Sequence, residues 1–446
     1  MKEDDIVRVL SETNFWGREI DTGISIPAYA EKIKKFSGSA IVSVIGPRRS
    51  GKTTICMQIL ESFIKEGMDR SQTLYVNFED PAFVSMLSGP AGMEEIYRSY
   101  RLLVNPGKPA VVVLDEVQNV PMWEKWVRVA SEKNRDMKII VTGSSSTLLS
   151  SEMATVLTGR TITVTVLPLS FSDFLRFRGV KIKEPYEMLS KEGTLKSLFL
   201  EYMEYGGFPA VAKEKDNDIK KALLKEYFDG MIFRDVIWRH KIKDMDTIRG
   251  LAEICMSSIS SPVSATKMRN VLVETLKRKI SPNRVVAFGG HLESGFLLFF
   301  VPIFSRKVKE RKLYPRKVYS IDTGVSNAVT LKFSPDLGRV AENLVFLHLK
   351  RIMHDGEIFY WRDKSQREVD FVIKRGLKIT GVIQVCWDMT NSKTEQREKN
   401  ALLDCMEEFG LKEGIIITGD KESTERMGNS VITCVPIWKW MLNKWD

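Results

Sequence analysis

Strand-like segments alternate with helical patterns along the first 180 residues. The strand-like segments are residues 41–45, 73–80, 110–120 and 138–146, and each contains a run of apolar side chains. After the first of them, apolar side chains recur three and four positions apart, the spacing of a buried helix face, at Ile55, Ile59, Leu60 and Phe63. Because alternating strands and helices build βαβ units, the pattern predicts an α/β fold with a parallel sheet over residues 1–180.

The pattern changes after residue 180. Residues 181–243 carry apolar positions three and four apart, which predicts a helical segment, and Gly206 and Gly207 interrupt it at a turn or hinge. Residues 244–333 predict three helices, a strand, a basic hairpin and a second strand. A helix, a hairpin and a buried strand follow. We therefore expect four parts: 1–180, 181–243, 244–333 and 334–446.

Composition places the chain among soluble globular proteins. Of its 446 residues 43% are hydrophobic and 28% charged. No run reaches the roughly 18 uncharged apolar residues of a membrane helix, and the start MKEDDIVRVL lacks the apolar core of a signal peptide. We therefore expect a cytoplasmic protein without a membrane partner. The five cysteines show no metal-ligand spacing and are odd in number, so neither a zinc site nor a disulfide framework is indicated.

Positive charge is concentrated in one part of the chain. The whole protein has a net charge of +10, and residues 241–330 alone hold 16 Lys and Arg against 7 Asp and Glu, which gives 16 − 7 = +9. A basic field confined to one segment is typical of a surface that binds a polyanion, whereas a merely soluble surface mixes both signs.

The segment IGPRRSGKTT, residues 45–54, has the spacing of a phosphate-binding loop between a strand and a helix. Glycines let the backbone N–H groups surround a polyphosphate, Lys52 brings charge to the β and γ phosphates, and Thr53 offers a hydroxyl to Mg²⁺. The dipole of the helix that begins near Thr53 adds to this attraction. The predicted nucleotide-binding residues are Gly46, Pro47, Arg48, Arg49, Ser50, Gly51, Lys52, Thr53 and Thr54.

Polar residues follow the third and fourth predicted strands. Open α/β sheets bind ligands at the carboxyl ends of their strands. Asp115 is therefore predicted to hold Mg²⁺ through water, and Glu116 to polarise the attacking water. Ser144, on the neighbouring strand, is predicted to sense the γ-phosphate, with an ordinary Gly-Ser loop as the alternative.

Four stretches carry a family resemblance: GPRRSGKTT, VVVLDEVQNVPMWEKWVR, VTGSSSTLLSSEMATVLTGRTITVTVLPLSFSDFL and YGGFPAV. They resemble prokaryotic and archaeal AAA-type (AAA+) P-loop ATPases with a C-terminal winged helix and a restriction-endonuclease-like domain, and the resemblance covers nearly the whole chain. It implies an additional-strand P-loop fold and hydrolysis of ATP with Mg²⁺, with residues 181–243 as a helical lid.

Within this pattern, Arg160 is a candidate arginine finger. A guanidinium stabilises charge on the transferring phosphoryl group, either in the same chain or across a subunit interface. Action across an interface would require a homo-oligomer. A structural ion pair is the alternative for Arg160. No sensor arginine is assigned in the lid, since Arg234 and Arg239 are both available.

The basic segment is predicted to bind duplex DNA as a winged helix. A helix-turn-helix places its last helix in the major groove while flanking basic residues fix it on phosphates. Here the third helix, near Asn283, Arg284 and His291, would read the bases. The phosphate clamp would comprise Arg306, Lys307, Lys309, Arg311 and Lys312. Docking of a protein partner is the alternative.

The last part resembles a restriction-endonuclease-like core in GRVAENLVFLHLKR, EIFYWRDKSQREVDFVIKRG and ITGVIQVCWDM. Active members need a helix Glu, a strand Asp and a Glu-x-Lys. Glu342 and Asp370 stand at matching places, but Gln384 and Cys386 replace the Glu and the Lys. Both changes weaken a site for a hard cation. We therefore expect a degenerate, inactive nuclease domain.

A turn in the same domain offers a second way to hold a ligand. Its positive residues could grip nucleic acid or a partner, unless neighbouring carboxylates neutralise them in surface ion pairs. The positive residues are Arg362, Lys364 and Arg367, and the carboxylates are Asp363 and Glu368.

These patterns together predict an ATPase that couples ATP hydrolysis to the placement of the winged helix and the nuclease-like domain on DNA. Two alternatives stay open: a slow ATP switch that docks a protein partner, and an ATP-gated DNA nuclease.

Overall fold

The computed structural model describes residues 1–38, 40–144, 159–182, 184–330, 336–353 and 356–442. The chain forms two compact units, Met1–Val166 and Leu167–Asp446. Residues 167–180 thus group with the second unit, although the sequence pattern assigns them to the first part. The division of the second unit into a lid, a winged helix and a nuclease-like domain stays a prediction.

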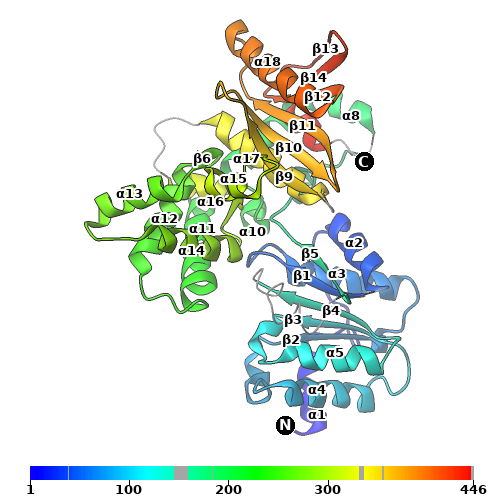
Figure 1. The fold of residues 1–446 in the computed structure, drawn as a ribbon. Helices are drawn as coiled ribbons and strands as arrows, with labels where there is room; N and C mark the ends of the chain where they lie inside the picture. Colours follow the sequence, from blue (N-terminus) through cyan, green and yellow to red (C-terminus); the bar gives the residue numbers. More distant parts are fainter. Residues whose placement is uncertain (39, 145–158, 183, 331–335, 354–355, 443–446) are drawn as a thin grey trace. The chain divides into compact units, whose positions relative to one another are not determined.

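The first unit is built on a five-stranded parallel sheet. Its strands lie in the order β2-β3-β4-β1-β5 (Figure 1), so β4 is inserted between β1 and β3. The strands are β1 (Ile41–Ile45), β2 (Thr73–Asn77), β3 (Val111–Asp115), β4 (Lys138–Gly143) and β5 (Thr161–Thr165). The α/β class and the parallel sheet are therefore confirmed.

Helices cover both faces of this sheet. The helices α2 (Pro27–Ser37) and α3 (Lys52–Lys65) lie on one face, and α4 (Pro90–Leu103) and α5 (Trp123–Lys133) on the other (Figure 1). Helix α1 (Glu3–Ser11) packs on α4. Every residue of β1 and β3 is buried. This two-sided burial explains why the strands read as continuous apolar runs rather than as alternating patterns.

The second and third strands are shorter than the pattern predicts. After β2 the chain turns into the 3-10 helix η2 (Pro81–Met86), where the Asp80 carboxylate accepts the Ala82 N–H. After β3 it turns into η3 (Val117–Asn119), and η1 (Arg70–Gln72) precedes β2. A polar side chain thus caps the turn after β2, whereas β3 ends where Glu116 takes a left-handed backbone conformation without a side-chain cap.

The second unit begins with a helical segment, as predicted. It contains α7 (Phe171–Phe177), α8 (Pro185–Ser190), α9 (Glu192–Tyr205), α10 (Pro209–Lys213), α11 (Asn217–Gly230) and the π-helical η5 (Met231–Trp238). The expected turn at Gly206 and Gly207 separates α9 from α10. Its Gly207 N–H donates to the buried Asp322 carboxylate at 2.7 Å, which fixes the turn in the interior of this unit.

The basic segment forms the three predicted helices, a further short helix and a small antiparallel sheet in the order β6-β8-β7. In chain order the elements are α12 (Met245–Ser257), β6 (Ser261–Val263), α13 (Ala265–Leu276), α14 (Pro282–Ser294), β7 (Leu298–Val301), α15 (Val308–Leu313) and β8 (Arg316–Ser320). The predicted hairpin of β7 and β8 is present. Its connection, however, contains the short helix α15, because Glu310 accepts from the Ser305 hydroxyl and pairs with Lys307 there.

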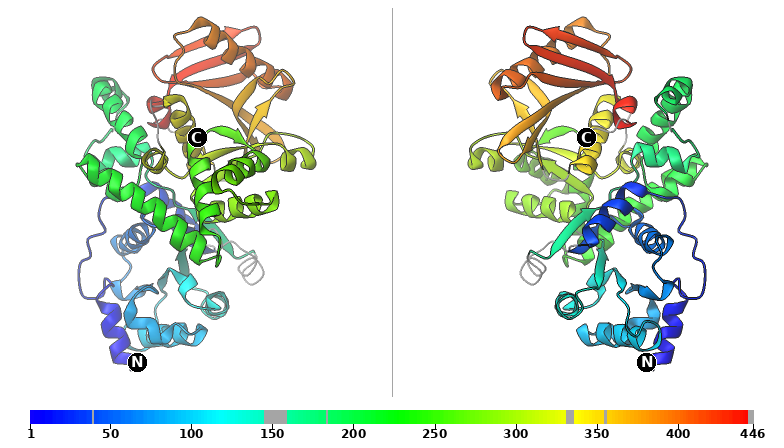
Figure 2. Two further views of the ribbon diagram at one scale, coloured as in Figure 1. Left: turned by 90° about the vertical axis from the view of Figure 1, so that its left-hand side faces the viewer. Right: turned by 90° about the vertical axis from the view of Figure 1, so that its right-hand side faces the viewer.

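The chain ends in a six-stranded mixed sheet, β13-β14-β12-β11-β10-β9, flanked by two long helices. Helices α17 (Leu337–Ile352) and α18 (Ser392–Phe409) lie on opposite faces of it (Figure 2). The strands are β9 (Glu357–Arg362), β10 (Glu368–Arg375), β11 (Lys378–Cys386), β12 (Glu413–Thr418), β13 (Ser423–Met427) and β14 (Ser430–Pro436). The helices α16 (Thr323–Val329) and α19 (Ile437–Leu442) pack nearby within the same unit.

None of the helices among the described residues is both long enough and apolar enough to cross a membrane.

Candidate functional site

The predicted phosphate-binding loop connects the end of β1 to the start of α3. Gly46 and Gly51 have φ values of 153° and 97°, in the region that favours glycine. A Cβ on Gly46 would lie 2.1 Å from the Val166 carbonyl oxygen, so no other residue fits there. The structure therefore gives these residues the strand, loop and helix context that a phosphate-binding loop requires.

Lys52 is held inside this loop. Its side chain is buried, and its ammonium donates to the carbonyl oxygens of Gly46 at 3.1 Å and Pro47 at 3.0 Å. The same ammonium lies 3.8 Å from a carboxylate oxygen of Glu116. The positive charge is thus placed between the loop and the predicted catalytic carboxylate.

Asp115, at the carboxyl end of β3, accepts hydrogen bonds from three hydroxyl groups. Thr53 of α3 and Tyr75 of β2 each donate to its Oδ2 at 2.7 Å. Thr142 of β4 donates to its Oδ1. The predicted metal pair, Thr53 and Asp115, is therefore brought together. Hydroxyl and carboxylate oxygens are the donors that Mg²⁺ prefers, so these residues fit the ion.

Tyr75 stays a phenol in this site. Burial and the charge of Asp115 raise the pKa of the Tyr75 hydroxyl well above its ordinary value. The hydroxyl consequently remains a proton donor to Asp115 at every physiological pH, which holds the carboxylate in one orientation.

Glu116 follows β3 in a left-handed backbone conformation, with φ at 51°. Its backbone N–H donates to the Thr142 hydroxyl at 3.0 Å, and its carboxylate accepts from the Gln118 amide at 2.5 Å. The single hydroxyl of Thr142 therefore contacts both acidic residues of the site. This links β4, the inserted strand, to the position of the predicted base.

Thr142, Tyr75 and Gln118 are the residues that the sequence pattern did not single out. Thr142 lies beside Asp115 only because β4 is the neighbour of β3 in the sheet. The prediction chose Ser144, the residue that follows this strand. Ser144 is buried just after β4, and its role as a γ-phosphate sensor stays a prediction.

Arg160 lies at the edge of the sheet opposite to the phosphate loop. It precedes β5, and its carbonyl accepts from the N–H of Ile41, the first residue of the parallel strand β1. Its guanidinium pairs with Glu132. A cavity of about 820 Å³ at this edge includes both side chains in its lining. In this structure Arg160 is therefore ion-paired away from the phosphate loop, and its action as an arginine finger, in the same chain or across a subunit interface, stays a prediction.

The predicted phosphate clamp divides into paired and unpaired cations. Lys307 pairs with Glu310, and Arg311 donates to the Ser305 carbonyl. The other three clamp residues, Arg306, Lys309 and Lys312, are exposed, and their side chains make neither an ion pair nor a hydrogen bond with any of the described residues.

Two of the predicted base-reading residues have contacts within the second unit, Arg284 in the basic segment and His291 with the helical segment before it. The Arg284 guanidinium pairs with Asp244 at 3.1 Å and lies over the Phe288 ring. The His291 ring stacks on His240 with centroids 4.0 Å apart, and burial lowers the pKa of both imidazoles. Asn283 is exposed on the first turn of α14.

The nuclease-like residues Glu342 and Asp370 do come together, but around a lysine from another element. Lys317 of β8 places its ammonium 2.9 Å from Glu342 and 2.6 Å from Asp370. Lys317 is one of the cations counted in the basic segment 241–330, but it is buried, because its side chain points from β8 toward α17 and β10. A lysine thus lies beside these two carboxylates in the fold, but it comes from position 317 and not from position 386.

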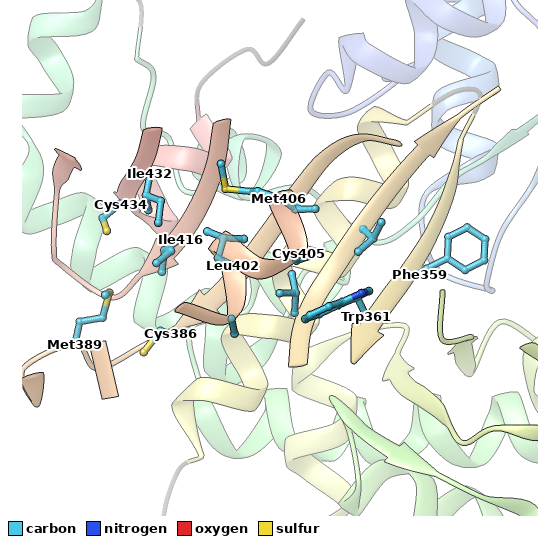
Figure 3. Close-up of a cluster of buried hydrophobic side chains, with 14 residues drawn as sticks. Phe359, Trp361, Cys386, Met389, Leu402, Cys405, Met406, Ile416, Ile432 and Cys434 are labelled. Carbon is cyan, nitrogen blue, oxygen red and sulfur yellow. The ribbon is translucent and has the colours of Figure 1, made fainter. Parts of the chain in front are cut away.

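Gln384 and Cys386 both contact other residues of the C-terminal part of the chain. The Gln384 side chain accepts the Asp370 N–H at 3.0 Å and donates to Glu398 of α18 at 2.6 Å. Cys386 belongs to the apolar cluster under α18 (Figure 3), where burial raises the pKa of its thiol to about 11. The thiol is consequently protonated and inert at neutral pH.

Ion pairs dominate the turn between β9 and β10. Arg362 pairs with Glu368, and Arg367 pairs with Asp363 and Asp404. Neighbouring carboxylates therefore neutralise two of the three cations of this turn, which is the alternative that the sequence left open. Lys364 is exposed and pairs with none of the described residues.

Comparison with known proteins places this site in a family. Residues 38–175 match the model of an AAA domain, while residues 196–336 and 337–440 match two domains of unknown function. An uncharacterized protein of Methanocaldococcus jannaschii is 34% identical over 418 residues, which covers 92% of this chain and 89% of that protein. The chain belongs to the family of this archaeal protein. Residues 38–175 of this chain are an AAA-type ATPase domain.

Two further comparisons are more distant. An uncharacterized protein of Haemophilus influenzae is 27% identical over 433 residues, or 94% of this chain and 98% of that protein. A DNA polymerase III gamma subunit-related protein of Thermotoga maritima aligns with a TM-score of 0.27 and 14% identity, over 60% of this chain and 99% of its own. That score is too low to inform on fold or function.

The AAA domain therefore unites its predicted nucleotide residues at one edge of its sheet. The loop and Lys52 fit a polyphosphate, the Thr53 and Asp115 oxygens fit Mg²⁺, and Glu116 stands beside them. This arrangement is suited to phosphoryl transfer, in which catalysis is mostly positioning and charge stabilisation.

Proposed function

We propose that this protein is a Mg²⁺-dependent ATP hydrolase that couples hydrolysis to the binding of duplex DNA. The observation that carries the hydrolase part is the contact of Thr53 with Asp115, with Glu116 and Lys52 next to it in the AAA domain. Lys52 binds the β and γ phosphates, and Thr53 and Asp115 hold the ion, which supplies positive charge to the phosphates. Glu116 orients the attacking water and accepts its proton.

Thr142→Val is expected to lower the ATP turnover number about tenfold, because it removes one hydrogen bond to a charged group worth about 1.5 kcal/mol. Valine keeps the shape of threonine but frees both Asp115 and the Glu116 backbone from their shared hydroxyl. Steady-state phosphate release at saturating ATP measures the change. Thr142→Ser retains the hydroxyl and serves as the matched control, so equal losses in both variants would contradict the assigned role.

The DNA part of the proposal is supported by the topology of residues 245–320. Helix α12, strand β6, helices α13 and α14, and the hairpin of β7 and β8 follow the order of a winged helix, with α14 as the last helix. The Ser281 hydroxyl caps α14 by accepting the Arg284 N–H. The three unpaired cations lie on the connection between β7 and β8, which is the wing in this reading. They are available to phosphates without breaking an ion pair.

Substitution of Arg306, Lys309 and Lys312 by Ala is expected to weaken duplex binding and to flatten its salt dependence. Each phosphate contact contributes about 0.9 to the slope of log affinity against log salt, so the slope should fall by about 2 to 3. Fluorescence anisotropy of a labelled duplex at several salt concentrations measures it. The matched control replaces Lys215, Lys221 and Lys225, three exposed lysines of the helical segment, by Ala. An equal loss of duplex affinity in the control would show that the total positive charge matters and not the position of these three residues.

The C-terminal domain is proposed to be an inactive relative of nucleases. Its support is the order of α17, the antiparallel strands β9 to β11, α18 and the parallel strand β12, together with the meeting of Glu342 and Asp370. Gln384 is engaged with Glu398 and offers no charge to a metal. In this proposal the domain positions DNA or a partner and does not cut.

The decisive experiment is the steady-state ATPase rate with and without duplex DNA at two salt concentrations, with Lys52→Ala as the inactive control. Stimulation by DNA that fades with added salt supports the coupling. A rate that is indifferent to DNA sinks the coupling and favours the slow ATP switch with a protein partner. Nicking of supercoiled plasmid with Mg²⁺ and ATP would instead support the nuclease alternative.

A further inference from the structure

Lys317 is surrounded by three carboxylates from two other elements. Its ammonium lies 2.9 Å from Glu342 of α17, 2.7 Å from Glu368 of β10 and 2.6 Å from Asp370 of β10. Only 1% of its side chain is exposed to solvent. An ammonium has three donors, so this one is saturated by three acceptors.

Other donors also contact the three carboxylates. Tyr319 donates at 2.7 Å to the same Glu342 oxygen that Lys317 contacts. Arg362 donates to the second oxygen of Glu368, and the Val385 N–H donates to the second oxygen of Asp370. Such a satisfied network is what a buried charge requires. Burial alone would lower the pKa of Lys317, but the three carboxylates raise it well above its ordinary value, so the lysine is charged.

The spacing of the cluster fits an ammonium better than a metal ion. Its oxygens stand 2.6 to 2.9 Å from the nitrogen. Magnesium binds oxygen at about 2.0 to 2.1 Å and calcium at about 2.3 to 2.6 Å. As they stand, the described residues include no group of three or more His, Cys, Asp or Glu side chains arranged to hold a metal. Of these two ions, calcium would require the smaller inward movement of the carboxylate oxygens.

We propose that Lys317 is the resident cation of this centre: its ammonium takes the place of a divalent ion, and a Ca²⁺-sized cation can enter only when the lysine is removed. The lysine also joins β8 of the basic module to the C-terminal sheet. The inference uses from the proposed function only the likeness of this domain to a nuclease, and it does not depend on ATP hydrolysis. It explains how Gln384 and Cys386 replace the usual ligands without leaving buried carboxylates unpaired.

The test uses the full-length, nucleotide-free protein with Asp115→Asn in every arm, which removes the metal ligand of the AAA domain. Calcium binding is measured by isothermal titration calorimetry with Lys317 in place and in Lys317→Met, which has a side chain of similar length without charge. We expect no uptake at millimolar Ca²⁺ with Lys317, and one equivalent in Lys317→Met. Addition of Asp370→Asn should abolish that equivalent.

Thermal unfolding gives an independent readout. In EDTA the midpoint of Lys317→Met should fall by roughly 10 °C, because buried carboxylates lose their partner, and Ca²⁺ should restore much of the loss. The matched control is Lys220→Met. Lys220 is also buried, and its ammonium pairs with a single carboxylate, that of Glu201, and donates to the Asn217 side chain. Its loss of stability should not respond to Ca²⁺.

The other possible results of these experiments either overturn the proposal or support it. Uptake of Ca²⁺ with Lys317 in place, or Mg²⁺-dependent plasmid nicking that Asp370→Asn removes, would overturn the proposal. So would a folded Lys317→Met that binds no Ca²⁺, or one that fails to fold even with Ca²⁺ present, since the ion should replace the missing charge. A variant that folds only with Ca²⁺ supports it. None of these readings is affected if the ATPase or DNA proposals fail.

Discussion

Glu116→Gln is expected to lower the ATP turnover number by a factor of about 10² to 10⁴, which is the usual contribution of a general base. Glutamine keeps the size of the side chain, so the loop, Lys52 and Thr53 remain in place to bind ATP. It cannot accept the proton of the attacking water, and it removes the negative charge that lies 3.8 Å from the Lys52 ammonium. Affinity for ATP should therefore stay the same or rise.

Two measurements are needed to separate these effects. Phosphate release at saturating ATP reports the turnover, and equilibrium binding of a fluorescent ATP analogue reports the affinity. Glu95→Gln changes a carboxylate of α4 that lies away from Asp115 and should leave both values unchanged. Normal turnover in Glu116→Gln would show that another group takes the proton, whereas loss of binding would place Glu116 in the binding of ATP.

Local sequence was enough to predict the parallel sheet and to select the loop and the acidic pair as candidates. The loop at Gly46 to Thr53 and the acidic pair at the end of β3 are each made of consecutive residues, so their relative positions follow from the backbone between them. The continuous apolar runs of β1 and β3 identify strands that are covered on both faces. For such features the sequence pattern and the structure carry the same information.

The features that were missed depend on which elements are neighbours in space. Thr142 contacts Asp115 because β4 is inserted between β1 and β3, and Arg160 lies far from the nucleotide edge because β5 runs parallel to β1. Lys317 is 25 residues from Glu342 and 53 from Asp370 in sequence. No periodicity in the chain shows that these three side chains meet. The charge count of residues 241–330 therefore includes Lys317 as if it were on a basic surface, although it is buried.

Gly206→Ala is expected to destabilise the second unit by about 3 to 5 kcal/mol, the sum of a strained backbone and a weakened hydrogen bond to a buried carboxylate. Gly206 has φ at 74° and ψ at −159°, a conformation that side chains oppose. A Cβ there would lie 1.9 Å from an oxygen of Asp322. The carboxylate must then move away from the Gly207 N–H, which now donates to it at 2.7 Å.

The midpoint of thermal unfolding, followed by circular dichroism, should consequently fall by roughly 10 °C. The matched control is Gly290→Ala in α14, where an added Cβ meets no atom within 4 Å and should stabilise the helix by up to about 1 kcal/mol. If both variants melted like the original chain, Asp322 would be free to move and the turn would not be fixed by it. A lower unfolding midpoint for Gly206→Ala than for Gly290→Ala would instead show that the stretch YGGFP needs its glycine for packing. The carboxylate of Asp322, 116 residues later in the chain, lies too close to the backbone at this position to leave room for a side chain.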